Sequence, residues 1–304
     1  MPYFSIVIPC FNAAETLNDT LDSIASQTFV DWEALIIDDG STDATWALAV
    51  ARTAKDSRFK VMRNPGQGPS SARNHAAMRS RGKVIAFCDA DDLWYPQKLA
   101  LMHQTFARPD VDGVYARVAF FDGKGSRSTS QVCDGPLSVQ TLLGENPVCT
   151  MSNVAVTRRT FIESGGFDVT MVHNEDLEWL IRVTGSGGRF LGLDEILVHY
   201  RTSPTGLSAN LDAMRIGRET ALATAARMGF PVDRRSEAIH LRYIARRALR
   251  TDAPPLQSLR MALAGVATSP VGFFTDIKRG GLTFLAALAA PIMPRRLRRS
   301  LFSN

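Results

Sequence analysis

The chain has 304 residues, of which 45% are hydrophobic and 21% charged, a composition typical of a folded globular protein rather than a disordered one. Its net charge of +5 is unevenly spread: residues 1–204 hold 19 Lys and Arg against 24 Asp and Glu, whereas residues 205–304 hold 16 against 6. No stretch reaches the roughly 18 apolar residues of a membrane span, and none of the four cysteines belongs to a CxxC pair, which argues against an integral membrane protein and a zinc knuckle.

The N-terminal stretch MPYFSIVIPC lacks the charged and long apolar segments of a signal peptide and is typical of a β-strand. We therefore expect a cytoplasmic protein with reduced cysteines.

The first hundred residues alternate short apolar runs with amphipathic segments. The apolar runs predict buried parallel strands at 4–9, 33–38, 59–63 and 83–88. The segments between them predict helices at 13–26, 41–54 and 69–80. Such a β-α-β-α-β-α-β series indicates a doubly wound α/β layer, in which ligands bind at the carboxyl ends of the strands.

The later part of the chain predicts further strands at 112–121, 152–157 and 189–201, a Gly/Ser-rich loop at 122–130 and a helix at 174–184. Beyond about residue 210 the pattern is helical and rich in arginine.

Three acids follow the fourth predicted strand in the stretch FCDADDLWYP (87–96). Asp89, Asp91 and Asp92 could cap a helix that starts near Pro96, but one acid would suffice for that. Carboxylates this close repel one another unless a cation neutralises them. Because hard oxygen ligands favour Mg²⁺ or Mn²⁺, the cluster predicts a divalent ion that bridges to a diphosphate.

Five motifs occur in order along the chain: PCFN at 9–12, IIDDGSTD at 36–43, SSARN at 70–74, DAD at 89–91 and the acidic pair of NEDLEW at 174–179. This ordered set resembles the inverting family 2 glycosyltransferases of the GT-A fold over about residues 4–205. The resemblance implies a doubly wound, mostly parallel GT-A sheet. It implies a glycosyltransferase domain at 1–209, a nucleotide-sugar-binding half at 1–110, an acceptor-binding half at 111–209, and a basic helical C-terminal region at 210–304.

The resemblance also implies that the PCFN loop holds the nucleobase, usually uracil. Pro9 would shape the pocket wall, Phe11 would stack on the base, and Asn12 belongs to the same loop. Glu15, expected just inside the first helix, would be within reach, or could equally be an acid at the N-terminus of that helix. Asp39 matches the acid that accepts a hydrogen bond from the base, and a carboxylate suits the uracil N3–H donor.

Asp38 and Asp43, which flank Asp39, are not assigned to the ligand, and a nicotinamide cofactor is not expected. Asp38 and Asp43 are expected to act as capping or turn acids. A nicotinamide site is disfavoured because no GxGxxG follows the first predicted strand.

Four residues are assigned to the diphosphate and its metal by the same resemblance. Arg73 would lie near the base or the diphosphate, the alternative being a surface arginine. Asp89 would contact ribose or metal, and Asp91 would bind the metal. Arg201 could clamp diphosphate oxygens.

The third metal ligand is left open. Many relatives have a histidine two residues after the arginine, where this chain has Ser203. His199 could substitute, or it could be a packed residue at the end of a strand.

The acidic pair at 175–176 would contain the catalytic base. We assign the base to Asp176, with Glu175 as its rival or as a partner of the acceptor hydroxyl. Such a base would deprotonate the hydroxyl that attacks the anomeric carbon, in a metal-assisted single displacement.

The resemblance therefore implies a hexosyl- or N-acetylhexosaminyltransferase. Its donor would be a nucleotide-diphospho-sugar, with UDP-sugar expected, and its acceptor a glycan or lipid-linked hydroxyl in cell-surface polysaccharide synthesis, with no nucleic-acid partner. Two alternatives are a sugar-nucleotide pyrophosphorylase, whose Gly-rich basic loop is absent from PCFNAAE, and a non-catalytic nucleotide-sugar-binding scaffold.

The basic C-terminal region supports two hypotheses. Leu256, Leu259, Leu263 and Val266 share one face of a predicted helix, and RRLRR occupies 295–299. The region could contact an anionic membrane at the inner face of the cell membrane, or it could form a helical cap on the catalytic domain or an oligomer contact.

Overall fold

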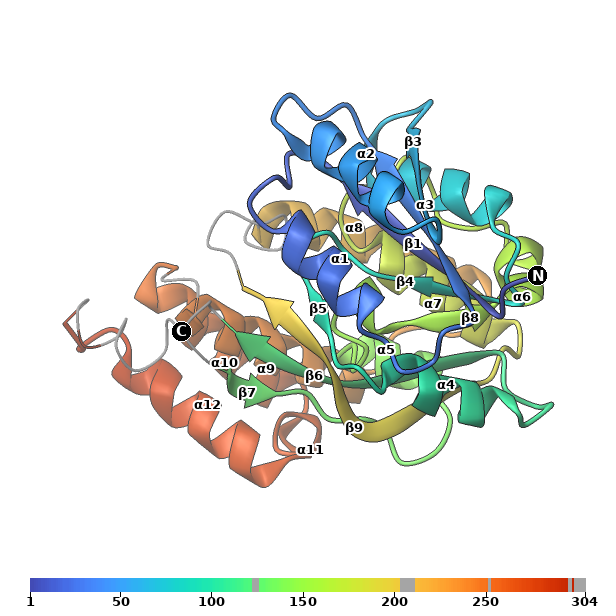
Figure 1. Ribbon diagram of the computed structural model, residues 1–304. Coiled ribbons are helices and arrows are strands. Elements are labelled where there is room, and N and C mark those ends of the chain that lie inside the picture. Colours follow the sequence, from blue (N-terminus) through green and yellow to red (C-terminus); the bar gives the residue numbers. More distant parts are fainter. Residues whose placement is uncertain (122–125, 203–210, 251–252, 295–296, 298–304) are drawn as a thin grey trace.

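A computed structural model describes residues 1–121, 126–202, 211–250, 253–294 and 297 (Figure 1). Its strands are β1 (Phe4–Cys10), β2 (Trp32–Asp38), β3 (Phe59–Arg63), β4 (Val84–Phe87), β5 (Leu93–Trp94), β6 (Gly113–Phe121), β7 (Ser126–Thr129), β8 (Ala155–Thr157) and β9 (Phe190–Arg201). Its helices in the first 202 residues are α1 (Leu17–Ala25), α2 (Thr45–Lys55), α3 (Gly68–Arg79), α4 (Lys98–Phe106), α5 (Val139–Gly144), a 3₁₀ turn (Met151–Asn153), α6 (Arg158–Glu163) and α7 (Glu175–Gly185).

The strands form one mixed sheet in the order β3-β2-β1-β4-β8-β6-β9-β5, with β7 paired to β6. β1 is parallel to both β2 and β4, so the chain crosses from one side of β1 to the other between β3 and β4. The carboxyl ends of β1, β2 and β4 therefore meet at one edge. This arrangement confirms the predicted α/β class, and the antiparallel strand β8 joins the parallel part to the pair β6 and β9.

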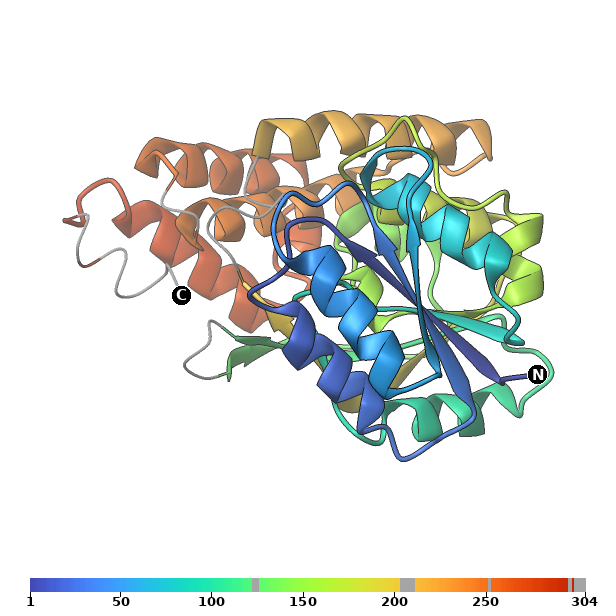
Figure 2. The same cartoon turned by 45° about the horizontal axis from the view of Figure 1, so that its top comes forward.

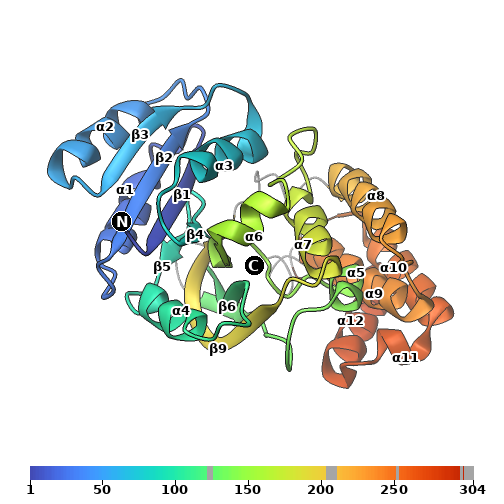
Figure 3. The same ribbon diagram turned by 90° about the vertical axis from the view of Figure 1, so that its right-hand side faces the viewer.

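Alternate residues of the central strands enter different core clusters. In β1, Val7 packs with α3, α6 and α7, whereas Ile6 and Ile8 pack with α1, α2 and α4. Because side chains alternate along a strand, the two helix groups cover opposite faces of the sheet (Figure 3). Both faces of the parallel strands are therefore buried, which explains their unbroken apolar sequences.

Five further helices follow the sheet: α8 (Leu211–Arg227), α9 (Arg234–Arg250), α10 (Pro255–Thr268), α11 (Pro270–Phe273) and α12 (Ile277–Ala289). They gather at the end of the molecule away from β1, β2 and β3 (Figures 2 and 3). Ala221 and Ala225 of α8 belong to the same core cluster as Trp179 of α7, while Phe273 centres a smaller cluster among α9 to α12. Of the described helices, none has the length and apolarity needed to cross a membrane.

The predicted helix at 13–26 begins later than expected, at Leu17. The amide groups of Asn12, Ala13 and Ala14 donate to side chains of the loop that precedes α2, so residues 13–16 form turns instead of helix. Glu15 consequently lies exposed in this turn, and its placement inside the helix was wrong. The second helix likewise begins at Thr45 instead of residue 41.

Four short elements were not predicted: β5, β7, α5 and α6. Each has two to six residues, too few to establish an apolar period. β7 falls within the expected loop at 122–130, of which 122–125 lie outside the described residues.

Candidate active site

The acids that follow β4 occupy different environments. Asp92 is fully buried, and its Oδ1 accepts a hydrogen bond of 2.9 Å from the backbone N–H of Arg201. Burial and the charges of Asp91 and Asp89 raise its pKa well above the usual value. Asp92 therefore ties the acidic loop to the end of β9.

Asp91 is the least compensated of the three acids. Burial, followed by repulsion from Asp89, raises its pKa to about 6. Among the described residues, no other residue donates a hydrogen bond to its carboxylate, and Arg201 donates from Nε to its backbone oxygen instead, at 3.0 Å. An unpaired carboxylate beside a second acid is a site at which a cation would be stabilised.

The donor set fits a divalent ion that retains ligands from solvent or substrate. Asp89 keeps 27% of its side chain exposed, and its charge lies close enough to Asp91 to raise the pKa of the Asp91 carboxyl. Within the described part of the chain, no group of three or more His, Cys, Asp or Glu is placed to hold a metal. Two carboxylates completed by water and phosphate oxygens is the pattern that Mg²⁺ accepts.

Arg73 connects this loop to the start of α7. Its side chain is 6% exposed, and the guanidinium donates from Nη2 to Asp89 Oδ1 at 2.7 Å and from Nη1 to Glu175 Oε1 at 2.9 Å. The alternative of a surface arginine is therefore wrong. The two acidic segments, which are far apart in sequence, share one buried cation.

Asp176 lies beside that ion-pair network without taking part in it directly. Its Oδ1 accepts a hydrogen bond of 2.8 Å from the backbone N–H of Leu177. Burial, followed by the charge of Glu175, raises the pKa of Asp176 to about 7, although the N–H of Leu177 and the charge of Arg73 oppose the shift. A carboxylate with this pKa can exchange a proton near neutral pH.

The loop after β1 is tied to the loop after β2. Asn12 Oδ1 accepts from the backbone N–H of Thr42 at 2.8 Å, and the Asn12 N–H donates to Ser41 Oγ at 3.0 Å. Phe11 beside it is 62% exposed, and Pro9 is half-buried near the strand end. The loop thus presents one unburied aromatic ring at the sheet edge.

Asp39 stabilises the loop that leads into α3. Its Oδ1 accepts from Asn64 Nδ2 at 2.6 Å and its Oδ2 from the Gly68 N–H at 2.8 Å. Each oxygen has a second lone pair, so the carboxylate can still accept from a ligand. Asp38, in contrast, is fully buried and pairs with Arg63, while Asp43 accepts the N–H groups of Thr45 and Ala14.

Arg201 ends β9 next to the acidic loop. Besides its bond to the Asp91 backbone, its Nη2 lies 3.7 Å from Asp19 Oδ2. His199 hydrogen-bonds Tyr95 Oη through Nε2 at 2.6 Å, and burial lowers its pKa. Ser203, at the expected position of a third ligand, lies outside the described residues.

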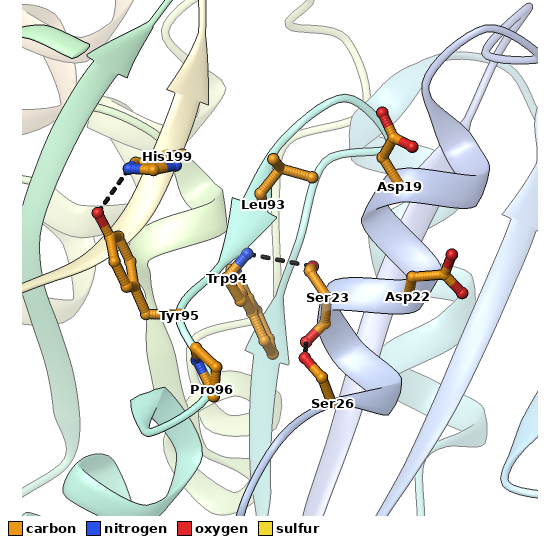
Figure 4. Close-up of a pocket in the computed structure, with 9 residues that line it drawn as sticks. All are labelled: Asp19, Asp22, Ser23, Ser26, Leu93, Trp94, Tyr95, Pro96 and His199. Carbon is orange, nitrogen blue, oxygen red and sulfur yellow. Dashed lines mark hydrogen bonds between the residues drawn. The ribbon is translucent and has the colours of Figure 1, made fainter. Parts of the chain in front are cut away.

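Near Arg201 the surface is hollowed into a groove of about 370 Å³ between α1 and β5 (Figure 4). Asp19, Trp94 and His199 are among its lining residues. Asp89, Asp91 and Asp176 do not line it, so this groove is distinct from the acidic site.

Two site residues escaped the sequence analysis. Thr150 donates from Oγ1 toward Asp89 Oδ2 at 3.3 Å and Asp92 Oδ2 at 3.5 Å, and Ser152 Oγ accepts from the Asp89 N–H at 2.8 Å. They lie about 60 residues from the acids in sequence, within no motif that identifies them.

Backbone geometry offers a further indication of function. In the described chain, three non-glycine residues have positive φ: Asn12, Cys149 and Asn174. Asn12 shapes the loop after β1, Cys149 precedes Thr150, and Asn174 precedes Glu175. Because such conformations cost energy and concentrate at functional sites, their positions agree with the site assembled above.

Comparison with known proteins now decides the family. Residues 5–165, more than half of the chain, match the family described as "Glycosyl transferase family 2". The chain belongs to this family. It is therefore a glycosyltransferase, and family membership gives no support to the pyrophosphorylase alternative.

Individual relatives agree with this family 2 assignment. The Escherichia coli UDP-Glc:alpha-D-GlcNAc-diphosphoundecaprenol beta-1,3-glucosyltransferase WfgD is 28% identical over 208 residues, which cover 68% of this chain and 79% of that protein. Staphylococcus aureus TarS 1-349 in complex with UDP-GlcNAc aligns with a TM-score of 0.64 at 15% identity, over 96% of this chain and 92% of that 1-349 fragment. The Pyrobaculum calidifontis mannosyltransferase PcManGT, in complex with GDP-Man and Mn²⁺, aligns with a TM-score of 0.57 at 18% identity, over 99% and 79%. These likenesses confirm the predicted GT-A fold.

Proposed function

We propose that this family 2 enzyme is an inverting glycosyltransferase that moves a sugar from a UDP-sugar to the hydroxyl of a lipid-linked glycan in cell-surface polysaccharide synthesis. The name of WfgD specifies a UDP-glucose donor and a diphosphoundecaprenol-linked acceptor, and TarS is described with bound UDP-GlcNAc. Both names support a UDP-sugar donor, and the name of WfgD supports a lipid-linked acceptor. A location at the inner face of the cell membrane belongs to the same proposal, because a lipid-linked acceptor is held in a membrane.

One observation carries the mechanism: the acids of the DAD loop and the acidic start of α7 share the buried Arg73. The leaving diphosphate and the catalytic base must lie on opposite sides of one anomeric carbon. The buried Arg73 guanidinium, paired with an acid of each segment, supports a fixed distance between the diphosphate site and the base. It also engages the Glu175 carboxylate, which favours Asp176 as the base.

The proposed reaction is a single displacement. Asp176 takes the proton of the acceptor hydroxyl as its oxygen forms a bond to the anomeric carbon, and the bond from that carbon to the diphosphate breaks. The nucleoside diphosphate leaves and the anomeric configuration inverts. A Mg²⁺ or Mn²⁺ ion held by Asp89 and Asp91 would supply neutralising charge to the diphosphate.

The remaining residues are assigned to donor binding. Phe11, exposed at the edge of the sheet, would stack on the base, with Pro9 and Asn12 fixing its loop and Asp39 accepting from the uracil N3–H. Arg201 donates to the Asp91 backbone through Nε, and its Nη2 lies 3.7 Å from Asp19, so the Nη groups would approach the diphosphate. Glu15, which is exposed in the turn that follows the same loop, would lie at the rim of the nucleotide site.

A panel of nucleotide-sugars tests the proposal, with released nucleoside diphosphate and the product anomer as measurements. We expect turnover with one UDP-sugar, dependence on Mg²⁺ or Mn²⁺, and a β-linked product from an α-linked donor. Replacement of Asp91 by Ala should abolish metal-dependent donor binding in calorimetry. An α-linked product would contradict the inverting mechanism, and full donor binding by Asp91→Ala would contradict the metal site.

A further inference from the structure

Helix α12 packs small residues and the ring of Phe284 against the protein, while its large aliphatic residues face outward. Gly280, Thr283, Ala287 and the C-cap residue Ala290 are buried against the other C-terminal helices. The outward set consists of residues between 45% and 86% exposed: Ile277, Leu282, Leu285, Leu288 and, just after the helix, Ile292. A helix packed on a domain surface normally buries its leucines and isoleucines.

The outward residues form one continuous face. Ile277, Leu285, Leu288 and Ile292 follow one another at intervals of eight, three and four residues, which returns to the same side of a helix. The face extends for about 20 Å, the length of a 13-residue helix. Exposed apolar surface of this extent indicates a site of interaction.

The charge of this part of the sequence identifies the partner. Lys278 is exposed beside Ile277 and Leu282, and the sequence of residues 277–304 contains six Lys and Arg and no Asp or Glu, although Arg279 pairs with Glu145 and Asp276. A second copy of the chain would present the same positive charge to this face, and the two copies would repel one another. An anionic lipid surface complements both the apolar face and its charge.

We propose that the outer face of α12 (Ile277, Leu282, Leu285, Leu288 and Ile292) docks on an anionic bilayer. The helix has 13 residues, too few to span the hydrocarbon core, so it lies along the membrane surface with its leucines inserted between headgroups. The inference rests on the proposed lipid-linked acceptor for its role, since docking would hold the GT-A domain beside such a substrate. Vesicle binding is independent of any donor sugar, so the two proposals can fail separately.

Flotation with lipid vesicles tests the docking face. The full chain should bind vesicles of 70% phosphatidylcholine and 30% phosphatidylglycerol, and should bind pure phosphatidylcholine far more weakly. Leu285→Gln/Leu288→Gln keeps good helix formers at exposed positions and should weaken binding to the anionic vesicles about tenfold or more. Val30→Gln/Val50→Gln, which removes two exposed valines on the far part of the GT-A domain, should bind as the wild type does.

Three results would overturn the inference. The first is no binding of the wild-type chain to anionic vesicles at low ionic strength, and the second is equal binding by the two double variants. The third is a wild-type dimer in solution that the Leu285→Gln/Leu288→Gln variant converts to a monomer, which would assign the face to self-association. Sugar transfer to a soluble acceptor analogue, measured as nucleotide release without vesicles, should occur at the same rate in the wild type and both variants. Absence of transfer in all three proteins would count against the proposed reaction alone.

Discussion

At the scale of single residues, Arg73 determines how the two acidic segments coexist. Its side chain is almost completely buried, and both of its partners, Asp89 and Glu175, are acids with limited access to water. A buried ion pair contributes little when complete, but removal of one member leaves an uncompensated charge. In this site two such charges would remain, facing each other.

Arg73→Gln should therefore destabilise the protein strongly. We expect a loss of about 3–5 kcal/mol in the free energy of unfolding, measured by urea denaturation near pH 7. Arg79→Gln, on the exposed side of the same helix, serves as the matched control and should change stability by less than about 0.5 kcal/mol. Equal stability of the two variants would show that Arg73 does not support the site.

Asp176→Asn should separate chemistry from binding. The amide preserves the size of the side chain but cannot take the proton from the hydroxyl of the glycan acceptor, so turnover should fall by about 10²–10⁴-fold. The donor dissociation constant, measured by calorimetry, should stay within about threefold because the base acts on the acceptor. Near-normal turnover would remove Asp176 from the proposed role and leave Glu175 as the candidate.

The raised pKa of Asp176 also predicts a pH dependence of stability. The protonated carboxyl favours the folded state, so its contribution is fully present below about pH 4, the unfolded pKa, and is lost as pH rises through about 7. Asp176→Asn should match wild-type stability near pH 4 and exceed it at pH 8 by about 4 kcal/mol. Thermal denaturation at the two pH values checks this, and a stability difference that does not change with pH would contradict the assigned pKa.

At the scale of elements, the sequence predicted the buried strands but not the features that depend on contacts between loops. The runs at 4–9 and 33–38 are continuous apolar stretches because β1 and β2 are buried on both faces. The start of α1 could not be predicted, because it depends on side chains of residues 41–45 that bind the amides of residues 12–14. Thr150 and Ser152 were missed for the same reason: only the fold brings them to Asp89.

The C-cap residue of α5, Glu145, links three elements. It accepts hydrogen bonds from Arg246 at 2.6 Å and Arg242 at 3.4 Å, both on α9, and lies 3.8 Å from Arg279 on α12. Although burial raises the pKa of Glu145, these arginines lower it below the usual value. The stability that Glu145 supplies is therefore present above its unfolded pKa and is lost as pH falls through its lower folded value.

Glu145→Gln should loosen the C-terminal helices without disturbing the sheet. We expect a loss of about 2 kcal/mol in stability and faster hydrogen exchange in α9 and α12, with β1 and β2 unchanged. Glu219→Gln, in the exposed pair with Arg215 on α8, is the control and should leave exchange as in the wild type. Uniform protection in both variants would mean that other contacts hold the helices.

At the scale of the whole molecule, the inner and outer sides of the C-terminal region differ. Its inner side is a cap: Ala221 and Ala225 enter the core beside Trp179, and Thr224 Oγ1 donates to the buried Glu178 at 3.2 Å. Its outer side carries the apolar face of α12. The apolar stripe predicted around Leu256 and Leu263 did not reveal this division, because both leucines are exposed on α10 while the small Ala262 is buried. Sequence periodicity identifies an apolar face but does not tell whether protein or solvent lies against it.

Removal of the region should consequently damage the fold and not merely the tail. A chain ending at residue 210 would leave Trp179 and its neighbours on α7 uncovered and would leave Glu178 without Thr224. We expect this chain to lose more than about 5 kcal/mol of stability from the lost apolar burial and to aggregate, whereas a chain ending at residue 294 should unfold as the full-length protein does. Calorimetry and size-exclusion chromatography make the comparison. A cooperative, monomeric transition for the chain ending at 210 would instead show that residues 1–209 form an independent domain.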